Sequence, residues 1–118
     1  MKIANPIAVI GEDKACEFLR KKGYKIIERN FRKGYGEIDI IAVKDKVLVF
    51  VEVKTKRGVA FGTPEEMFTK GKAERVKRMA SVYLEGREFN CRIDMVAIVL
   101  GESDQPLRIT HYPNVVMW

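Results

Sequence analysis

Three charged residues in one stretch of the chain have side chains that could support phosphodiester hydrolysis. Asp39, Glu52 and Lys54 interrupt two apolar runs, GEIDIIAVK and VLVFVEVK. Charges inside core strands cost free energy unless they are paired or bind a ligand. Two neighbouring carboxylates can hold a divalent cation, and a lysine can act on water or neutralise charge on a phosphate. Together they predict metal-dependent hydrolysis.

The geometry expected of a β-hairpin places these charges on one surface. Side chains alternate between the two faces of a strand. A two-residue turn at 45–46 puts Asp39 opposite Glu52, and the same register puts Glu37 opposite Lys54, with neighbours about 5 Å apart. A three-residue turn would send the two acids to opposite faces. The alternative reading is a salt bridge on a solvated sheet face.

A third acid precedes the hairpin. Glu12 stands three, four and seven positions before Ala15, Cys16 and Leu19, so it lies on the apolar stripe of a helix that faces the sheet. It is a candidate third carboxylate for the same site. The alternative is an acid at the margin of that stripe.

Basic residues surround these acids in the sequence. The chain carries 22 Lys and Arg against 16 Asp and Glu, a formal charge of +6, which is a weak indication of a polyanionic partner. Many soluble domains carry a similar excess. Phe61 and Trp118 are candidates for stacking on bases, although a lone aromatic is more often packing. The candidate phosphate contacts are Lys56, Arg57, Lys70, Lys72 and Arg75.

Composition excludes several other classes. The 118 residues and 47% apolar content fit one domain over 1–118. No apolar run approaches the roughly 20 residues that span a bilayer, and acid and glycine come too early for a signal peptide, so we expect a cytoplasmic protein. One histidine, His111, and two cysteines outside metal spacing disfavour a His-based zinc site. Oxygen ligands then imply Mg²⁺ or Mn²⁺.

Local signals predict a mixed α/β layer fold in the order α-β-β-β-α-β-β. Asn5-Pro6 starts a helix that stops at Gly23, and a second helix reaches about residue 85 from Thr63, or from Thr69 if Gly71 breaks it. Asn30 is expected to fix a turn and Asp94 to pair with a basic residue. The expected strands are 24–31, 37–43, 47–54, 92–100 and 107–112, with a basic loop at 56–62.

Asp39 followed by Glu52-Val53-Lys54 resembles the signature of the PD-(D/E)xK nuclease superfamily. GEID at 36–39 and VFVEVKT at 49–55 further resemble the YraN-like family of small bacterial proteins. The resemblance covers nearly the whole chain, through the segments Gly11-Glu12-x-x-Ala15, Gly23-Tyr24, Arg29-Asn30, Phe61-Gly62 and the helix of Lys72 and Arg75. It departs from the superfamily at Ile38, where proline is common, and from the family at Lys56, where arginine is common.

The resemblance implies a restriction-endonuclease-like fold, a mixed sheet flanked by helices. It implies that Asp39 and Glu52 are metal ligands, with the Val53 carbonyl as a third. Lys54 would be the catalytic lysine. Glu12 would be an auxiliary acid, similar to that of archaeal Holliday-junction resolvases.

Three functions follow for testing. The first is a Mg²⁺- or Mn²⁺-dependent endonuclease acting on DNA, with branched or structured DNA as a candidate substrate. A junction enzyme needs two active sites, so it would be expected to form a homodimer. The second is a nucleic-acid-binding module without turnover, and the third is a protein-interaction domain.

Overall fold

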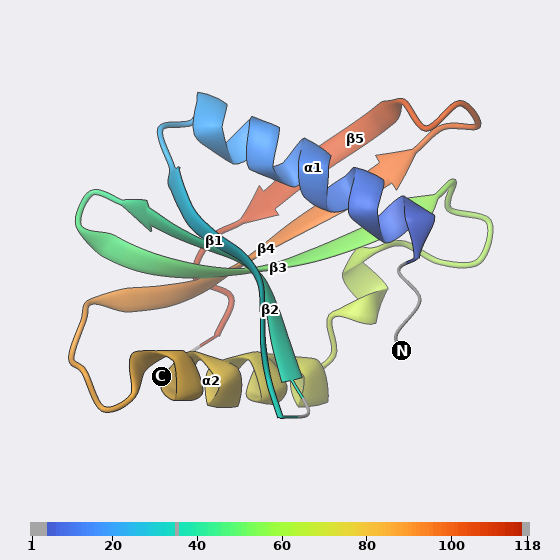
Figure 1. Cartoon of the computed structure of the whole chain (residues 1–118). Helices are drawn as coiled ribbons and strands as arrows, with labels where there is room; N and C mark the ends of the chain where they lie inside the picture. The colour runs from blue at the N-terminus through green and yellow to red at the C-terminus, as the bar shows by residue number, and fades with distance from the viewer. Residues whose placement is uncertain (1–4, 35, 117–118) are drawn as a thin grey trace.

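A five-stranded sheet lies between two helices in the computed structural model, which describes residues 5–34 and 36–116 (Figure 1). The strands lie in the order β1-β2-β3-β4-β5; β3 and β4 are parallel and the other pairs antiparallel. This confirms the predicted α/β architecture and element order, apart from one added 3-10 turn, η1. The elements are α1 (Pro6–Lys21), β1 (Lys25–Lys33), β2 (Gly36–Lys44), β3 (Val47–Arg57), η1 (Glu65–Met67), α2 (Lys70–Leu84), β4 (Cys91–Leu100) and β5 (Pro106–Tyr112).

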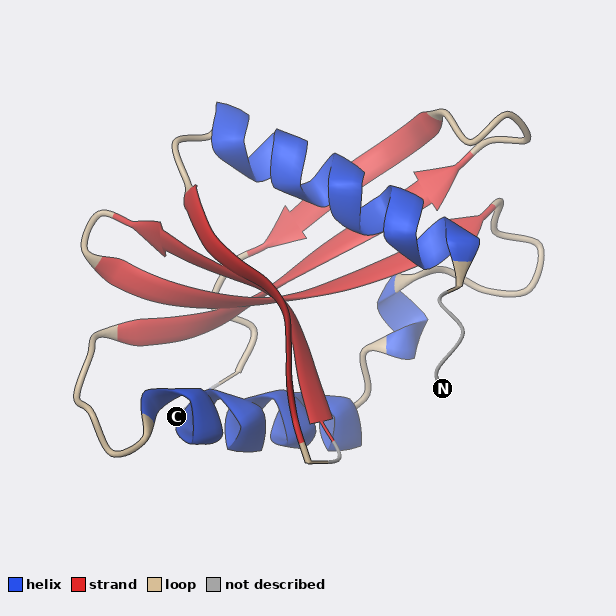
Figure 2. Cartoon of the chain, viewed as in Figure 1, coloured by secondary structure: helices blue, strands red, loops and turns tan. Residues whose placement is uncertain are grey.

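A helix covers each face of the sheet (Figure 2). Each face carries its own apolar core. On the α1 face, Leu19 packs with Val51 and Val53. On the α2 face, Phe50 packs with Val76. Because β3 is covered on both faces, its sequence is almost continuously apolar, and its charged residues stand out. Within the described residues, no helix combines the length and apolar character needed to cross a membrane.

Both helices begin at the caps that the sequence indicates. Asn5 Oδ1 accepts the Ile7 N–H at 3.1 Å before the first turn of α1. Thr69 Oγ1 accepts the Lys72 N–H at 3.2 Å at the start of α2, which confirms the second of the two predicted starts. Thr63 instead precedes the separate η1 turn.

The β2–β3 hairpin has the predicted two-residue turn. Asp45 and Lys46 both have positive φ, 50° and 65°, and Lys44 pairs with Val47. β3 then continues to Arg57, beyond the predicted end, because residues 54–57 pair in parallel with residues 97–100. The predicted basic loop at 56–62 therefore begins only at residue 58.

The strands β2 and β3 separate toward the middle of the sheet. Their ladder ends at Ile40 and Val51, while β2 continues to pair with β1 and β3 with β4. Figure 1 shows the β1–β2 ribbon bending away from β3 toward α2.

The turn expected at Asn30 is wrong: this residue lies inside β1 with φ of 54°, opposite the stretch of β2 that holds Asp39. The left-handed residue bends the strand instead of ending it.

Candidate active site

A cavity of about 480 Å³ lies where β2 and β3 separate. Its walls come from α1, β2, β3, α2 and the end of β1, so residues far apart in sequence meet there. Most of the predicted site residues are among its lining. The charged residues that line the cavity are Glu12, Arg32, Glu37, Asp39, Glu52, Lys54, Lys72 and Arg75.

Asp39 lies at the point of separation and is 7% exposed. The predicted ladder pair of Asp39 with Glu52 is wrong, because the ladder stops one pair earlier. Instead, Asp39 Oδ2 accepts the Val53 N–H at 2.7 Å, which satisfies a backbone donor of β3. Burial and the charge of Glu52 raise the pKa of Asp39 well above its usual value, although the Val53 bond opposes this. The two carboxylates still face one cavity.

Glu52 is 4% exposed, and two lysines contact its carboxylate. Its Oε1 lies 3.1 Å from Lys54 Nζ and 3.8 Å from Lys72 Nζ. Burial and the neighbouring Lys54 lower the pKa of Lys72. Burial also disfavours the charged form of Lys54, but contact with Lys72 and the charge of Glu52 outweigh it and raise the pKa of Lys54. Lys54 therefore holds its proton more strongly than Lys72.

Glu12 of α1 reaches the same cavity, as its place on the apolar stripe predicted. Burial raises the pKa of Glu12; Arg29 opposes the rise, while Glu37 and Glu52 add to it. The predicted ladder pair of Glu37 with Lys54 is wrong, because the β2–β3 ladder ends at Ile40 and Val51. Arg32 Nε of β1 donates to Glu37 Oε2 at 2.8 Å. Sequence reasoning missed Arg32, whose place beside a turn carried no signal of the site.

The predicted phosphate contacts divide into two groups. Lys72 and Arg75 line the cavity from α2. Lys56, Arg57 and Lys70 lie outside its lining, and Arg57 forms an ion pair with Asp104. The basic rim next to the acids is therefore formed by α2.

The donor set fits a hard divalent cation only in part. Asp39 and Glu52 offer two buried carboxyl groups, the ligand type that Mg²⁺ and Mn²⁺ prefer. Among the residues that the structure describes, no three His, Cys, Asp or Glu side chains are grouped to hold a metal ion. Further ligands would have to be backbone carbonyls, water or substrate oxygens, which is usual for Mg²⁺.

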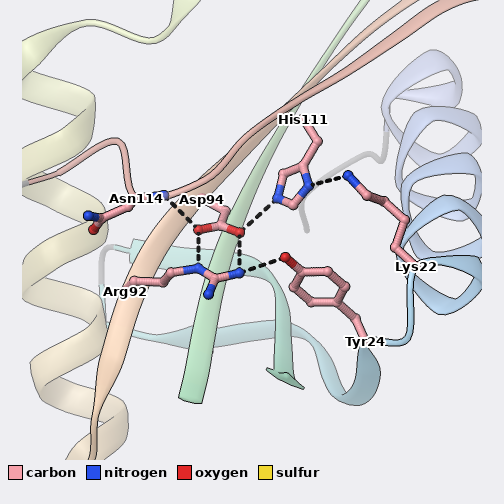
Figure 3. A network of polar contacts seen from close by, with 6 residues as sticks. All are labelled: Lys22, Tyr24, Arg92, Asp94, His111 and Asn114. Carbon is pink, nitrogen blue, oxygen red and sulfur yellow. Dashed lines mark hydrogen bonds and ion pairs between the residues drawn. The ribbon is translucent and has the colours of Figure 1, made fainter. Parts of the chain in front are cut away.

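A second buried polar cluster lies away from the cavity (Figure 3). Asp94 is fully buried, and its Oδ2 lies 2.7 Å from His111 Nε2. Its Oδ1 accepts Arg92 Nε at 3.0 Å and the Asn114 N–H at 2.9 Å. These contacts outweigh burial and lower the pKa of Asp94. The cluster joins β4 and β5 and confirms that Asp94 pairs with basic residues; its other members are Tyr24 and Lys22.

A mixed sheet with helices on both faces, opened where two buried acids and a lysine meet, is consistent with a restriction-endonuclease-like fold. The chain belongs to the family described as Uncharacterised protein family UPF0102, whose model matches residues 11–98. That range contains Glu12, Asp39, Glu52 and Lys54. The membership confirms the predicted YraN-like resemblance and by itself assigns no activity.

Relatives of nearly equal length match most of the chain. A UPF0102 protein of Dictyoglomus turgidum is 39% identical over 111 residues, 92% of this chain and 94% of the relative. One from Syntrophomonas wolfei is 46% identical over 107 residues, 88% of this chain and 91% of the relative. One from Caldicellulosiruptor saccharolyticus is 43% identical over the same length. The similarity therefore extends over most of the chain.

Proposed function

We propose that this chain is a metal-dependent endonuclease that hydrolyses phosphodiester bonds in DNA. One observation carries the proposal: Asp39, Glu52 and Lys54 meet at a single cavity although the strands that bear them have separated. Burying two acids at one cavity costs free energy, and at Asp39 the Val53 N–H does not offset this cost, since the pKa of Asp39 stays raised. A cation bound at the two carboxyl groups, with a phosphate beside it, would offset this free-energy cost.

Asp39 and Glu52 would hold Mg²⁺ or Mn²⁺, with the Val53 carbonyl as a further ligand. When bound, the cation supplies a Lewis acid that offsets phosphate charge and makes water more acidic. Val53 keeps Asp39 in place through its N–H, so the carboxylate is oriented before any ligand arrives. Glu12, half-buried across the cavity, would position a water molecule.

Lys54 would contact an oxygen of the scissile phosphate as an ammonium. In the reaction, a water oxygen bonds to phosphorus and the bond from phosphorus to one sugar oxygen breaks. The water proton goes to solvent and the leaving oxygen is protonated. Negative charge accumulates on the phosphate oxygens on the way, and a fixed cation in a partly dry cavity stabilises that charge.

DNA is the favoured polyanion because the acids lie inside a basic rim. Lys72 and Arg75 line the cavity, and the chain carries a formal charge of +6. Such a rim attracts a sugar–phosphate backbone without reading sequence. A preference for branched or structured DNA, a homodimer acting on it and a cytoplasmic location belong to the same proposal.

The test is cleavage of duplex, single-stranded and four-way-junction DNA with Mg²⁺, with Mn²⁺ and with chelator. We expect metal-dependent cleavage that Glu52→Gln and Lys54→Ala each reduce at least about 100-fold. Glu66→Gln and Lys46→Ala remove the same charges outside the cavity lining and should leave the rate within about twofold of wild type.

Each other outcome contradicts the proposal in a distinct way. Equal cleavage by wild type and both cavity variants would identify a contaminant. Salt-dependent binding without cleavage would identify a binding module. Absence of binding to any polynucleotide, with no metal bound at millimolar concentration, would leave a protein-interaction domain.

A further inference from the structure

An aromatic ring stands in solvent on the loop that follows β3. Phe61 is 96% exposed and its neighbour Val59 is 54% exposed. Scattered apolar residues on a surface are ordinary, but an almost completely exposed phenyl ring is not. The construction of the loop at 58–64 shows how the ring is presented.

The loop is held at both ends. The Gly58 N–H donates to the Leu100 carbonyl at 3.0 Å where β3 ends. At the far side, the Gly62 N–H donates to the Val59 carbonyl at 3.2 Å, which closes a turn around Phe61. Gly62 has φ of 109°, and a Cβ there would lie 2.8 Å from Glu66 Oε2. The ring is thus displayed on an anchored turn.

The loop also joins two walls of the candidate active site. It leaves β3 after Glu52 and Lys54 and leads through η1 into α2, which supplies Lys72 and Arg75. In Figure 1 it projects beyond the end of β3. Of the acids that follow it, Glu65 is neutralised by Arg108 at 2.5 Å. A polyanion that continued from the cavity along the segment between β3 and α2 would meet this loop.

We propose that Phe61 is a stacking wedge for DNA bound at the cavity, packing its ring against a base face exposed at a branch or strand end. This inference rests on the proposed function and names the residue that would give it a preference for branched DNA. Aromatic side chains presented beside a cationic groove stack on bases whatever their identity. An intact duplex must unstack to offer such a face, whereas a branch point already offers one. Phe61 therefore selects branched over continuous DNA.

The experiment measures binding in chelator, which separates it from catalysis. The full chain is titrated against a four-way junction and a duplex of equal length, with 2-aminopurine at the branch point. We expect Phe61→Ala to weaken junction binding about 10- to 100-fold and to abolish the fluorescence change, with duplex binding altered less than about twofold. Phe61→Trp should retain junction binding.

Phe89→Ala is the matched control, because Phe89 is also exposed, at 53%, but lies between α2 and β4 and not on the loop at 58–64. The wedge is overturned if Phe61→Ala leaves junction binding unchanged or weakens both DNAs equally. It is also overturned if Phe61→Ala changes the mass of the free protein in sedimentation, which would make the ring a contact between protein copies.

Cleavage by wild type, measured in parallel, separates the two proposals. Cleavage that persists while Phe61→Ala binds normally refutes the wedge alone. Junction binding that depends on Phe61, without any cleavage, refutes the nuclease and leaves the wedge. A wild-type chain that binds neither DNA refutes both.

Discussion

The carboxylate of Asp39 holds the backbone N–H of Val53 at 2.7 Å, just past the last paired residues of β2 and β3. In a continuous hairpin, that N–H would bond to the neighbouring strand. Here a side chain takes over the bond, so the two strands can separate without leaving the donor unpaired. The hydrogen bond that satisfies the Val53 N–H where the strands separate therefore also fixes Asp39, a candidate metal ligand, at the edge of the cavity.

Asp39→Asn should stabilise the metal-free protein. The pKa of Asp39 is raised by burial and by Glu52, so the wild type loses stability as pH rises through that pKa. Asparagine carries no charge and its carbonyl can still accept the Val53 N–H. We expect a gain of about 1 kcal/mol in unfolding free energy at pH 7, shrinking toward pH 4.

Thermal melts across pH measure this effect, and Mn²⁺ provides the second readout. The ion should raise the Tm of the wild type and leave that of Asp39→Asn unmoved, since one ligand is gone. A metal-free Asp39→Asn protein that is less stable than wild type at pH 7 would refute the reading of Asp39 as a strained buried charge.

Lys72→Ala should impair turnover more than binding. Lys72 Nζ lies 3.8 Å from Glu52 Oε1 and shares this carboxylate with Lys54, so it borders the reacting phosphate in the proposed complex. We expect kcat to fall about 10- to 100-fold and the Kd for DNA to rise less than about tenfold. Arg78→Ala removes one charge from the same helix outside the cavity lining and should change only Kd. Equal losses in kcat from both variants would contradict this role.

Gly11→Ala should push α1 away from the sheet. A Cβ at residue 11 would lie 1.8 Å from Thr55 Oγ1 and 2.8 Å from Thr55 Cβ, so the helix has to shift. We expect a loss of about 1–3 kcal/mol, measured by chemical denaturation. Gly71→Ala, with its nearest atom 4.0 Å away, should instead gain up to about 1 kcal/mol in α2.

Thr55→Ala provides the complementary test of this contact. Among the residues that the structure describes, buried Thr55 Oγ1 has no hydrogen-bond partner, so its removal costs little and makes room for the new methyl group. Thr55→Ala should therefore recover part of the loss in the Gly11→Ala background. Strictly additive effects of the two changes would show that the helix and strand do not meet here.

The free energy of unfolding should decrease as the pH falls, because the ion pair of Glu65 is lost in acid. Arg108 lies 2.5 and 2.9 Å from its two carboxylate oxygens, and this contact lowers the pKa of Glu65 from 4.5 to about 2. Since the folded pKa is depressed, the stabilisation is present above pH 4.5 and is lost as pH falls toward 2. Glu65→Gln should cost about 1 kcal/mol at pH 7 after screening by solvent, and nothing near pH 2.

Calorimetry at pH 7, 4 and 2 checks the Glu65 prediction. Glu66→Gln on the same turn removes a charge without the Arg108 contact and should leave the pH profile of wild type intact. If Glu65→Gln follows the wild type in parallel at all three pH values, the ion pair carries no stability.

Much of the fold could be predicted because its signals are local. The caps at Asn5 and Thr69 depend on hydrogen bonds to residues two or three positions away. The turn at Asp45 and Lys46 sets the β2–β3 register as far as Ile40. The end of β3 was missed because residues 54–57 are polar on their own and become strand through pairing with β4.

The sequence predicted most of the charged residues that line the cavity, but not how their side chains pair. Asp39, Glu52 and Lys54 are conspicuous as charges in apolar strands, and Glu12 as an acid on an apolar stripe. Extending the hairpin register gave two ladder pairs that the structure lacks, because the bend at Asn30 in β1 carries β2 away. Arg32 had no comparable signal, since its role comes from that bend.

By itself, the sequence determined which charged residues interrupt the apolar segments and which helices and strands carry them, because residue type, periodicity and caps act over a few positions. The tertiary structure decided that β2 and β3 part at Asp39, that α2 brings Lys72 onto Glu52, and that Glu37 turns to Arg32. These contacts join segments distant in the chain, and they follow from how helices and strands pack, which no local pattern encodes.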